Sequence, residues 1–222
     1  GVAINQLFFF EGLNLTTPIN AAIIMTTNPI LVIVISAFLI GEKITPQKVL
    51  GIFFGIVGAG TLILNSGSIS FDNNFFIGNL LVFINATSYA IYLVLVKGLM
   101  KKYQPLTVMF FVFLFGLFFV FPFGYQQLTS IDIELFSRDI YLKVLFVVIC
   151  TTFIAYLFNA FALKTLSPSV VSIYIYLQPV LASVIAIIYN SDSIDYIKIL
   201  SSFFIFTAVF LVSIPSKKVI TN

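Results

Sequence analysis

The sequence nearly repeats itself without gaps at an offset of 150 residues, so that residues 4–64 match residues 154–214. The clearest matching positions are Thr17-Pro18 and Ser167-Pro168, Asn28-Pro29 and Gln178-Pro179, Lys48 and Lys198, and Phe53-Phe54 and Phe203-Phe204. Two copies of one unit in a strongly apolar chain indicate a membrane protein built by duplication, an architecture typical of secondary transporters. The repeat therefore bears on function as well as on fold.

The composition places most of the chain in lipid. Hydrophobic residues make up 60% of the 222 residues and charged residues 9%, whereas about a quarter of a soluble domain is charged. The chain has no histidine and one cysteine, Cys150, so it offers neither the commonest metal ligand and general base nor an internal disulfide. The basic residues are dispersed among loops. We therefore expect a membrane protein, not an enzyme, with no metal, no other cofactor and no nucleic-acid partner.

Seven stretches are long and apolar enough to cross a bilayer, which requires about 20 residues. They are residues 18–40, 45–64, 76–100, 106–123, 141–163, 168–189 and 196–214. The opening run, residues 1–10, is too short to cross and is interpreted as the end of a truncated helix. The predicted fold is an all-α membrane protein with eight helices present, the first of them incomplete.

Lysines and acidic residues separate between the two sets of alternating loops. One set holds Lys43, Lys48, Lys97, Lys101, Lys102, Lys164, Lys217 and Lys218, and the other holds Arg138, Lys143 and Lys198 with nearly all of the acidic residues. The positive-inside rule then predicts a multi-pass protein of the cell inner (plasma) membrane with its C-terminus in the cytoplasm.

The same count predicts that the two copies are inverted. Glu42 falls on the lysine-rich side, and its counterpart Asp192 falls on the opposite side. An inverted pair needs an odd number of helices in each unit, and the offset contains five. We therefore expect residues 1–65 to hold the last three helices of the first repeat and residues 76–215 the complete second repeat, so that eight of ten helices are present.

Polar side chains inside the spans form stripes at helical spacing. Because lipid offers them no partners, they point either to a cavity or to neighbouring helices. The predicted lining residues of a substrate cavity are Asn28, Asn85, Tyr89, Tyr92, Tyr156, Asn159, Tyr174 and Gln178. Amide and phenol groups suit a small-molecule substrate, while bonding between helices is the structural alternative for each residue.

The proline of each amide-proline pair, Pro29 and Pro179, falls near the middle of its span, where it kinks a helix and frees a carbonyl group. We expect these kinks to border the cavity, with a role in packing alone as the alternative. Small residues occupy one face of residues 45–64 and of its counterpart. They are Gly51, Gly55, Gly58 and Gly60, with Ser201, Ser202 and Ala208. Close helix packing is the expected role, and a homodimer contact is the alternative.

Residues 1–45, GVAINQLFFFEGLNLTTPINAAIIMTTNPILVIVISAFLIGEKIT, look like the third and fourth helices of EamA-type proteins of the drug/metabolite transporter superfamily. Residues 156–188, YLFNAFALKTLSPSVVSIYIYLQPVLASVIAII, are similar to the matching helices of the second repeat. The resemblance implies a ten-helix inner-membrane carrier with a central cavity, whose members export amino acids, drugs or other metabolites, while some import. One departure is Ser191-Asp192-Ser193, where the second repeat often has Gly-Glu.

These observations predict an alternating-access transporter of a small metabolite, an exporter of amino acids or related compounds, with the lipid bilayer as its other partner. The alternative is a membrane scaffold that does not transport, in which neighbouring helices fill the polar stripes. An intramembrane enzyme ranks last because no acid, base and nucleophile converge. The residues leave the coupling ion and the direction of transport open.

Overall fold

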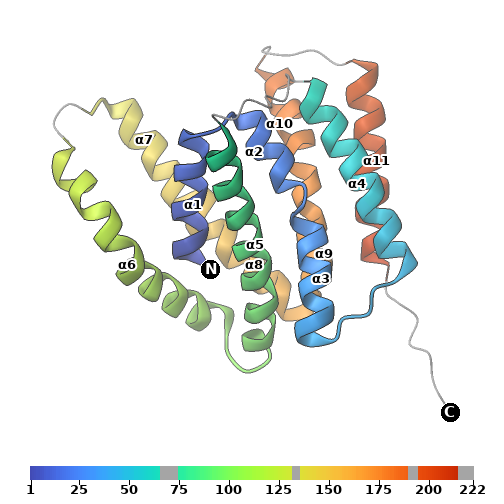
Figure 1. Ribbon diagram of the computed structural model, residues 1–222, viewed down its shortest axis with the longest axis horizontal. Coiled ribbons are helices and arrows are strands. Elements are labelled where there is room, and N and C mark those ends of the chain that lie inside the picture. Colours follow the sequence, from blue (N-terminus) through green and yellow to red (C-terminus); the bar gives the residue numbers. More distant parts are fainter. Residues whose placement is uncertain (66–74, 132–135, 190–194, 215–222) are drawn as a thin grey trace.

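The computed structural model describes residues 1–65, 75–131, 136–189 and 195–214, which form helices joined by short turns with no strand among them (Figure 1). The helices are α1 (Val2–Asn14), α2 (Pro18–Met25), α3 (Asn28–Ile40), α4 (Pro46–Asn65), α5 (Phe76–Met100), α6 (Pro105–Ser130), α7 (Arg138–Phe146), α8 (Ala155–Thr165), α9 (Pro168–Ile173), α10 (Leu177–Ile188) and α11 (Tyr196–Ser213). A π-helical segment, η3 (Val147–Ile154), joins α7 to α8, and a 3₁₀ turn, η4 (Tyr174–Tyr176), joins α9 to α10.

Seven helical stretches within these residues are long and apolar enough to cross a membrane, and they match the seven predicted spans. This confirms the expectation of an all-α membrane protein. The largest difference is at α6, which continues to Ser130 although the span was predicted to end at residue 123. Helical hydrogen bonding persists beyond the apolar run, where the Thr129 hydroxyl bonds the Tyr125 carbonyl oxygen at 3.1 Å. Hydropathy marks where a helix leaves lipid, not where the helix ends.

Helices α2 and α9 begin for the same local reason, which is a capping hydroxyl residue followed by proline. The Thr17 hydroxyl accepts a hydrogen bond from the Asn20 N–H at 3.1 Å, and the Ser167 hydroxyl accepts one from the Val170 N–H at 3.4 Å. Proline follows in the first turn, where its missing N–H costs nothing. Each repeat therefore starts its α2 or α9 helix at a defined residue.

Both proline-containing spans are interrupted just before the second proline. The span of α2 and α3 breaks at Thr26 and Thr27, two residues before Pro29, and their hydroxyls bond the Ile23 and Ile24 carbonyl oxygens at 2.6 and 2.7 Å. The span of α9 and α10 tightens into η4 before Pro179. The same two oxygens also accept the Thr26 and Thr27 N–H groups at 3.0 Å. The threonine hydroxyls thus find their own partners within the break, where lipid supplies none.

Helices α4 and α11 pack in opposite directions, and their contacts are reciprocal. The Phe54 and Phe204 rings, which are 150 residues apart, stack with centroids 5.8 Å apart and an interplanar angle of 14°. A Cβ atom at Gly51 would lie 3.0 Å from the Ala208 carbonyl oxygen, and one at Gly58 would lie 2.8 Å from the Ser201 carbonyl oxygen. The repeat offset makes Ser201 the counterpart of Gly51 and Ala208 the counterpart of Gly58. The two contacts are therefore equivalent, and a pseudo-twofold axis runs between the helices.

A hydrogen bond on the same axis joins the two interrupted spans. The buried Tyr176 hydroxyl donates to the Thr26 carbonyl oxygen at 2.9 Å, and these residues are again 150 apart. The Tyr176 ring packs directly over Gly55 of α4, where a side chain would collide with it. Contacts of this kind are those that two inverted copies of one unit would make, while the division at residues 1–65 and 76–215 stays a prediction.

The glycine face of α4 is filled by α11 and Tyr176 of the same chain. Gly60 differs, because no described heavy atom lies within 4 Å of a Cβ atom built there. The small residues therefore serve close packing within the chain, and a homodimer through Gly51, Gly55 and Gly58 would have to displace α11. The remaining core joins α3, α5, α6, α8 and α9 around Leu93, Met109 and Leu163.

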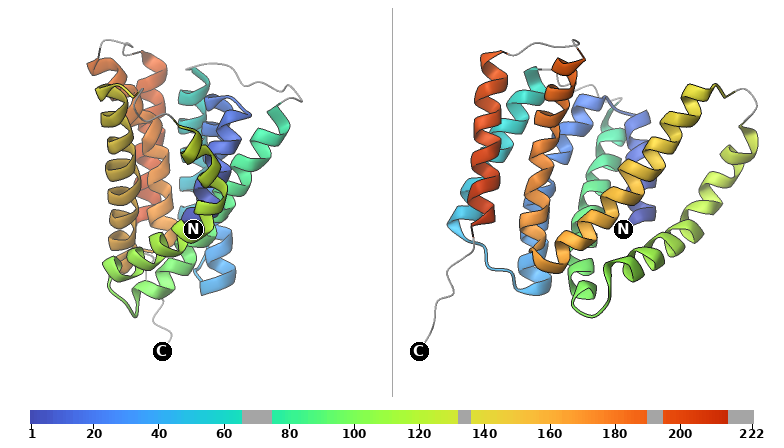
Figure 2. Two further views of the ribbon diagram at one scale, coloured as in Figure 1. Left: turned by 90° about the vertical axis from the view of Figure 1, so that its left-hand side faces the viewer. Right: turned by 180° about the vertical axis from the view of Figure 1, so that it is seen from behind.

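The turns at residues 41–45, 101–104 and 166–167 lie together at one end of the bundle, at the bottom of Figure 1. We call this the lysine-rich end, because Lys43, Lys101, Lys102 and Lys164 lie there, and the other end the opposite end. In the right-hand view of Figure 2, α6 and α7 lean away from the other helices toward the opposite end. The alternation of loops between two ends agrees with the predicted spans.

Substitution of Gly58 should separate the repeats. In Gly58→Ala the new methyl group meets backbone of α11, so we expect a loss of about 1–3 kcal/mol and a clearly lower melting temperature of the purified protein. Gly60→Ala is the control, because it meets open space and gains up to about 1 kcal/mol of helix propensity. Equal melting temperatures for the two variants would contradict the packing described.

Candidate functional site

A polar cavity of about 290 Å³ lies where α1, α5, η3 and α8 meet the break between α9 and α10. Its lining residues are Asn5, Gln6, Phe9, Phe10, Met25, Asn85, Tyr89, Val147, Thr151, Thr152, Ala155, Tyr156, Asn159, Ile175 and Gln178. The size suits a small molecule, and the site combines aromatic walls with several amide and hydroxyl groups, as small-molecule sites usually do. We refer to it as the polar cavity.

The structure brings together five predicted residues: Asn85, Tyr89, Tyr156, Asn159 and Gln178 all line the polar cavity. The α5 and α8 stripes meet across it, where the Asn159 amide Nδ2 donates to the Tyr89 hydroxyl at 3.2 Å. The spacing, four residues for Asn85 and Tyr89 on α5 and three for Tyr156 and Asn159 on α8, turns each pair to one side of its helix. Five residues predicted from shared helix faces thus line one pocket, and its use as a substrate cavity stays a prediction.

Three predicted residues lie elsewhere. Asn28 is fully buried and does not line the polar cavity, and its amide donates to the Ala86 carbonyl oxygen at 3.4 Å. The Tyr92 ring contacts the Tyr156 ring, with centroids 5.6 Å apart, but its hydroxyl donates to Met109 Sδ, away from the polar cavity. Tyr174 is 48% exposed and lines neither this cavity nor the apolar pocket next to it.

The 3₁₀ turn η4 explains the position of Tyr174. A 3₁₀ turn advances about 120° per residue, where an α-helix advances about 100°. Tyr174 and Gln178 would share a face of a regular α-helix, but η4 lies between them and rotates Tyr174 away. The expectation that the two residues line one cavity fails at this turn.

Asn5 and Gln6 of α1 were not among the predicted residues, although they complete the cavity. The Tyr156 hydroxyl donates to Asn5 Oδ1 at 2.9 Å, and the Asn85 side-chain amide donates to the Asn5 carbonyl oxygen at 2.5 Å. The repeat contains the missing signal, since Gln6 precedes Tyr156 by 150 residues. Transfer of each stripe to its counterpart would have added α1 to the site.

The π-helical segment η3 supplies one wall of the cavity through Val147, Thr151 and Thr152. The Thr151 and Thr152 hydroxyls both bond the Val147 carbonyl oxygen, at 2.8 and 3.0 Å. The protons of both hydroxyls are therefore used within the widened helix turn, so these groups can only accept further hydrogen bonds. π-Helical turns within α-helices are frequent at functional sites.

The groups that remain available for a ligand are amides. The Gln178 side chain has no hydrogen-bond partner among the described residues, and Asn85 Oδ1 is buried without one in the same part of the chain. No acidic or basic side chain is among the lining residues that the structure describes. A buried net charge would lack a counter-ion here, so the cavity suits a molecule whose own charges cancel or that has none.

An apolar pocket of about 720 Å³ adjoins the polar cavity. It lies between α2, α4 and α10, toward the opposite end, and is bordered by Ala22, Leu62 and Ala186. The two share the lining residues Phe9, Met25, Ile175 and Gln178. A ligand could therefore place its polar groups beside the amides and an apolar group beside α2 and α10.

Two polar contacts among the described residues hold the lysine-rich end together. Glu42 follows α3 and pairs with Lys48 at 2.6 Å, with both side chains largely buried. Lys97 donates to the Leu163 and Leu166 carbonyl oxygens at 2.8 and 2.9 Å. Here α3 packs on α9, whereas their counterparts α10 and α2 face each other across the apolar pocket.

The electrostatics of Glu42 favour the closed end. Burial of the carboxyl acts to raise its pKa, but the hydrogen bond and charge of Lys48 act against this, and the hydroxyls of Ser167 and Ser169 act in the same direction as Lys48. Together these groups hold the pKa of Glu42 below its ordinary value. Ser167 and Ser169 lie at the start of α9, so Glu42 at the end of α3 lies close to the other repeat.

Comparison with known proteins gives one family. The model of the EamA-like transporter family matches residues 1–64 and 76–214. An uncharacterized transporter of Archaeoglobus fulgidus is 26% identical over 95% of the chain and 72% of its own length. The uncharacterized transporter YyaM of Bacillus subtilis is 27% identical over 80% of the chain, and the chain spans 59% of that relative.

Two further similarities concern a shorter match and the fold. The aromatic amino acid exporter YddG of Ancylobacter novellus is 32% identical over 90 residues, which are 39% of the chain and 31% of that protein. A solved crystal structure matches with a TM-score of 0.79 at 19% identity, over 94% of this chain and 71% of the other. At that identity the match shows the fold alone.

Protonation of Glu42 should loosen the lysine-rich end. A carboxyl group whose pKa is held below its ordinary value near 4.5 stabilises the fold above that value, and this contribution is lost as the pH falls through the lowered pKa. We expect the melting temperature of the purified protein to drop more between about pH 6 and about pH 3 than that of Glu42→Gln.

The matched control is Asp139→Asn, which removes an exposed pair with Lys143 at the opposite end. Exposed pairs contribute about 0–1 kcal/mol, so this variant should follow the unsubstituted protein across the pH range. Parallel pH profiles for the unsubstituted protein and Glu42→Gln would refute the role given to Glu42.

Proposed function

Because the chain belongs to the EamA-like transporter family, we propose that it is a secondary transporter that exports an amino acid or a related small metabolite by alternating access. The coarser part of this statement, a multi-pass membrane transporter, rests on the family and on the seven apolar helices. Substrate, direction and mechanism are the proposal. The substrate is taken to occupy the polar cavity.

The observation that carries the proposal is the difference between the two ends of the bundle. The packed pair α3 and α9 and the separated pair α10 and α2 are related by the repeat offset. If α10 packed on α2 while α3 separated from α9, the apolar pocket would close and the lysine-rich end would open. A cavity between inverted repeats would then face each side of the membrane in turn.

Two features support an amino acid or a similar molecule. The amides of the polar cavity can bond a zwitterion whose charges cancel, and the adjoining apolar pocket can accept an apolar side chain. The partial similarity to an aromatic amino acid exporter points in the same direction. The lysine distribution supports a plasma-membrane protein with the lysine-rich end in the cytoplasm, so that the described state would open to the outside.

The alternative is a membrane scaffold that does not transport. It draws support from the bonds that Asn5, Tyr156, Tyr89 and Asn159 make to one another, because neighbouring helices already satisfy these groups. The free amide of Gln178 distinguishes the two ideas. A scaffold has no use for it, whereas a transporter would bond its substrate there.

Gln178→Met keeps the side-chain volume and removes the free amide. The test is the efflux of radiolabelled amino acids from cells that express the protein, with and without a pH gradient. Loss of one substrate hydrogen bond, about 1–1.5 kcal/mol, should reduce kcat/KM about tenfold while membrane insertion and melting temperature stay unchanged. Tyr156→Phe should reduce kcat/KM and also the melting temperature, because it breaks the hydrogen bond to Asn5.

The matched control is Gln47→Met, at an exposed position of α4 outside the polar cavity, which should transport normally. Efflux of all amino acids that equals the background of cells without the protein would favour the scaffold. Normal efflux in Gln178→Met, Tyr156→Phe and Tyr89→Phe together would show that the substrate binds elsewhere.

A further inference from the structure

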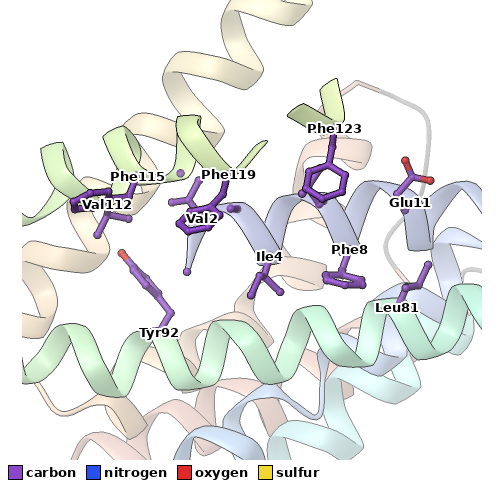
Figure 3. Close-up of a pocket in the computed structure, with 14 residues that line it drawn as sticks. Val2, Ile4, Phe8, Glu11, Leu81, Tyr92, Val112, Phe115, Phe119 and Phe123 are labelled. Atoms are coloured by element: carbon purple, nitrogen blue, oxygen red, sulfur yellow. The ribbon is translucent and has the colours of Figure 1, made fainter. Parts of the chain in front are cut away.

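An apolar groove of about 430 Å³ lies between the end of α5 and the first half of α6. All of its lining residues fall within residues 99–115, and none of them lines the polar cavity. The lining residues farthest along α6 are Val112 and Phe115, which face Tyr92 of α5 in Figure 3. We refer to this space as the α5–α6 groove.

The α5–α6 groove starts at the lysine-rich end of the bundle and follows α6 into the membrane. Tyr103 lies in the turn between α5 and α6, and both helices are long and apolar enough to cross a bilayer. The helix rises about 12 Å between Thr107 and Phe115, and half of a hydrocarbon core is about 15 Å thick. Leu99, Phe111 and Phe115 are exposed. The groove therefore has the length and the apolar surface to hold an acyl chain of one leaflet.

Three lysines gather where the groove meets the surface of the membrane. Lys101 and Lys102 lie in the turn that borders the groove, and both are exposed. Lys164, near the end of α8, is held beside the same turn by a 3.3 Å hydrogen bond from its Nζ atom to Gln104 Oε1. The positive-inside rule accounts for lysines on one side of the membrane, but not for their convergence from two distant segments on one groove.

The positive charge of these three lysines has no carboxylate partner within the part of the chain that the structure describes. None of the three forms an ion pair there, and Lys164 bonds a neutral amide. The described acidic residue at this end of the bundle is Glu42, which pairs with Lys48 at 2.6 Å. Clustered basic side chains beside a gap between membrane helices are typical binding sites for anionic lipid headgroups.

We propose that the α5–α6 groove binds an anionic phospholipid of the phosphatidylglycerol type, with one acyl chain along α6 and the phosphate beside Lys101, Lys102 and Lys164. Ammonium groups donate charge-assisted hydrogen bonds to phosphate oxygens. A zwitterionic headgroup adds a positive charge of its own, which the three lysines repel, so the groove selects for net negative charge. The site lies in the leaflet at the lysine-rich end and is independent of the proposed substrate and of its transport.

The chain contains no tryptophan, so one introduced tryptophan reports on its own surroundings alone. Phe111→Trp places the reporter in the groove, six residues after α6 begins at Pro105. Phe158→Trp places it on an exposed face of α8 outside the groove, seven residues before that helix ends at Thr165. Each protein is reconstituted in phosphatidylcholine vesicles with increasing fractions of phosphatidylglycerol that carries brominated, fluorescence-quenching acyl chains. Brominated phosphatidylethanolamine serves as the second series.

We expect Phe111→Trp to reach half-quenching at about fivefold less brominated phosphatidylglycerol than Phe158→Trp, and the two to coincide in the phosphatidylethanolamine series. Addition of Lys102→Gln to Phe111→Trp should weaken this preference, and addition of Lys101→Gln as well should abolish it, with the melting temperature unchanged. The matched control is Lys43→Gln, which removes one exposed lysine of the same end outside the groove and should leave the preference intact. A salt concentration of about 0.5 M should weaken the preference by screening the charges.

Four results would each overturn the proposal. Coincident curves in the phosphatidylglycerol series, or an equal preference for phosphatidylethanolamine, would mean that the groove selects no anionic lipid. Retention of the preference without Lys101 and Lys102 would remove these lysines from the site. An equal loss in Lys43→Gln would mean that the whole lysine-rich end attracts anionic lipid with no site in the groove. Absence of quenching in Phe111→Trp by either brominated lipid would mean that protein fills the groove. None of these measurements depends on transport.

Discussion

A polar group that faces lipid has no solvent partner, and this constraint decides how two helices can be interrupted in the middle of a membrane. At the α2–α3 break the two threonine hydroxyls bond carbonyl oxygens of α2, and the Thr26 carbonyl oxygen accepts the Tyr176 hydroxyl, which comes from the other repeat. Tyr176 can reach Thr26 because Gly55 of α4 leaves room for its ring. The break, the contact between repeats and the packing of α4 therefore depend on one another.

The polar cavity illustrates a compromise between order and binding. Asn5, Asn85 and Tyr156 satisfy one another and hold α1, α5 and α8 in place. A fully satisfied network is rigid but has nothing left to offer a ligand, whereas free buried amides cost stability. The structure keeps most of the network satisfied, and the Gln178 amide, at the boundary between the polar cavity and the apolar pocket, has no partner among the described residues. Order is thus concentrated on α1, α5 and α8, and the groups left for a ligand are Gln178 of α10 and Asn85 Oδ1 of α5.

Much of this arrangement could be predicted from the sequence, because membrane spans and repeats leave strong periodic signals. The stripes on α5 and α8 located the polar cavity, since regular helices keep residues four apart on one side. Tyr174 was misplaced because a short 3₁₀ turn leaves no hydropathy signal, and Asn5 and Gln6 were overlooked because α1 is too short to register as a span. The burial of Asn28 against Ala86 depends on how α3 is oriented relative to α5, and the residue pattern of a single helix does not determine that orientation.

The self-pairing of Phe54 with Phe204 has a consequence for the history of the fold. Residues that meet their own counterparts across a twofold axis need no linker between the two units, so identical separate copies could make the same stack. Such copies would have to sit in the bilayer in opposite orientations. The α4–α11 contact is therefore the kind of interface that a dual-topology homodimer would use, preserved within a single polypeptide, and any change at position 54 in such an ancestor would have altered both sides of the stack at once.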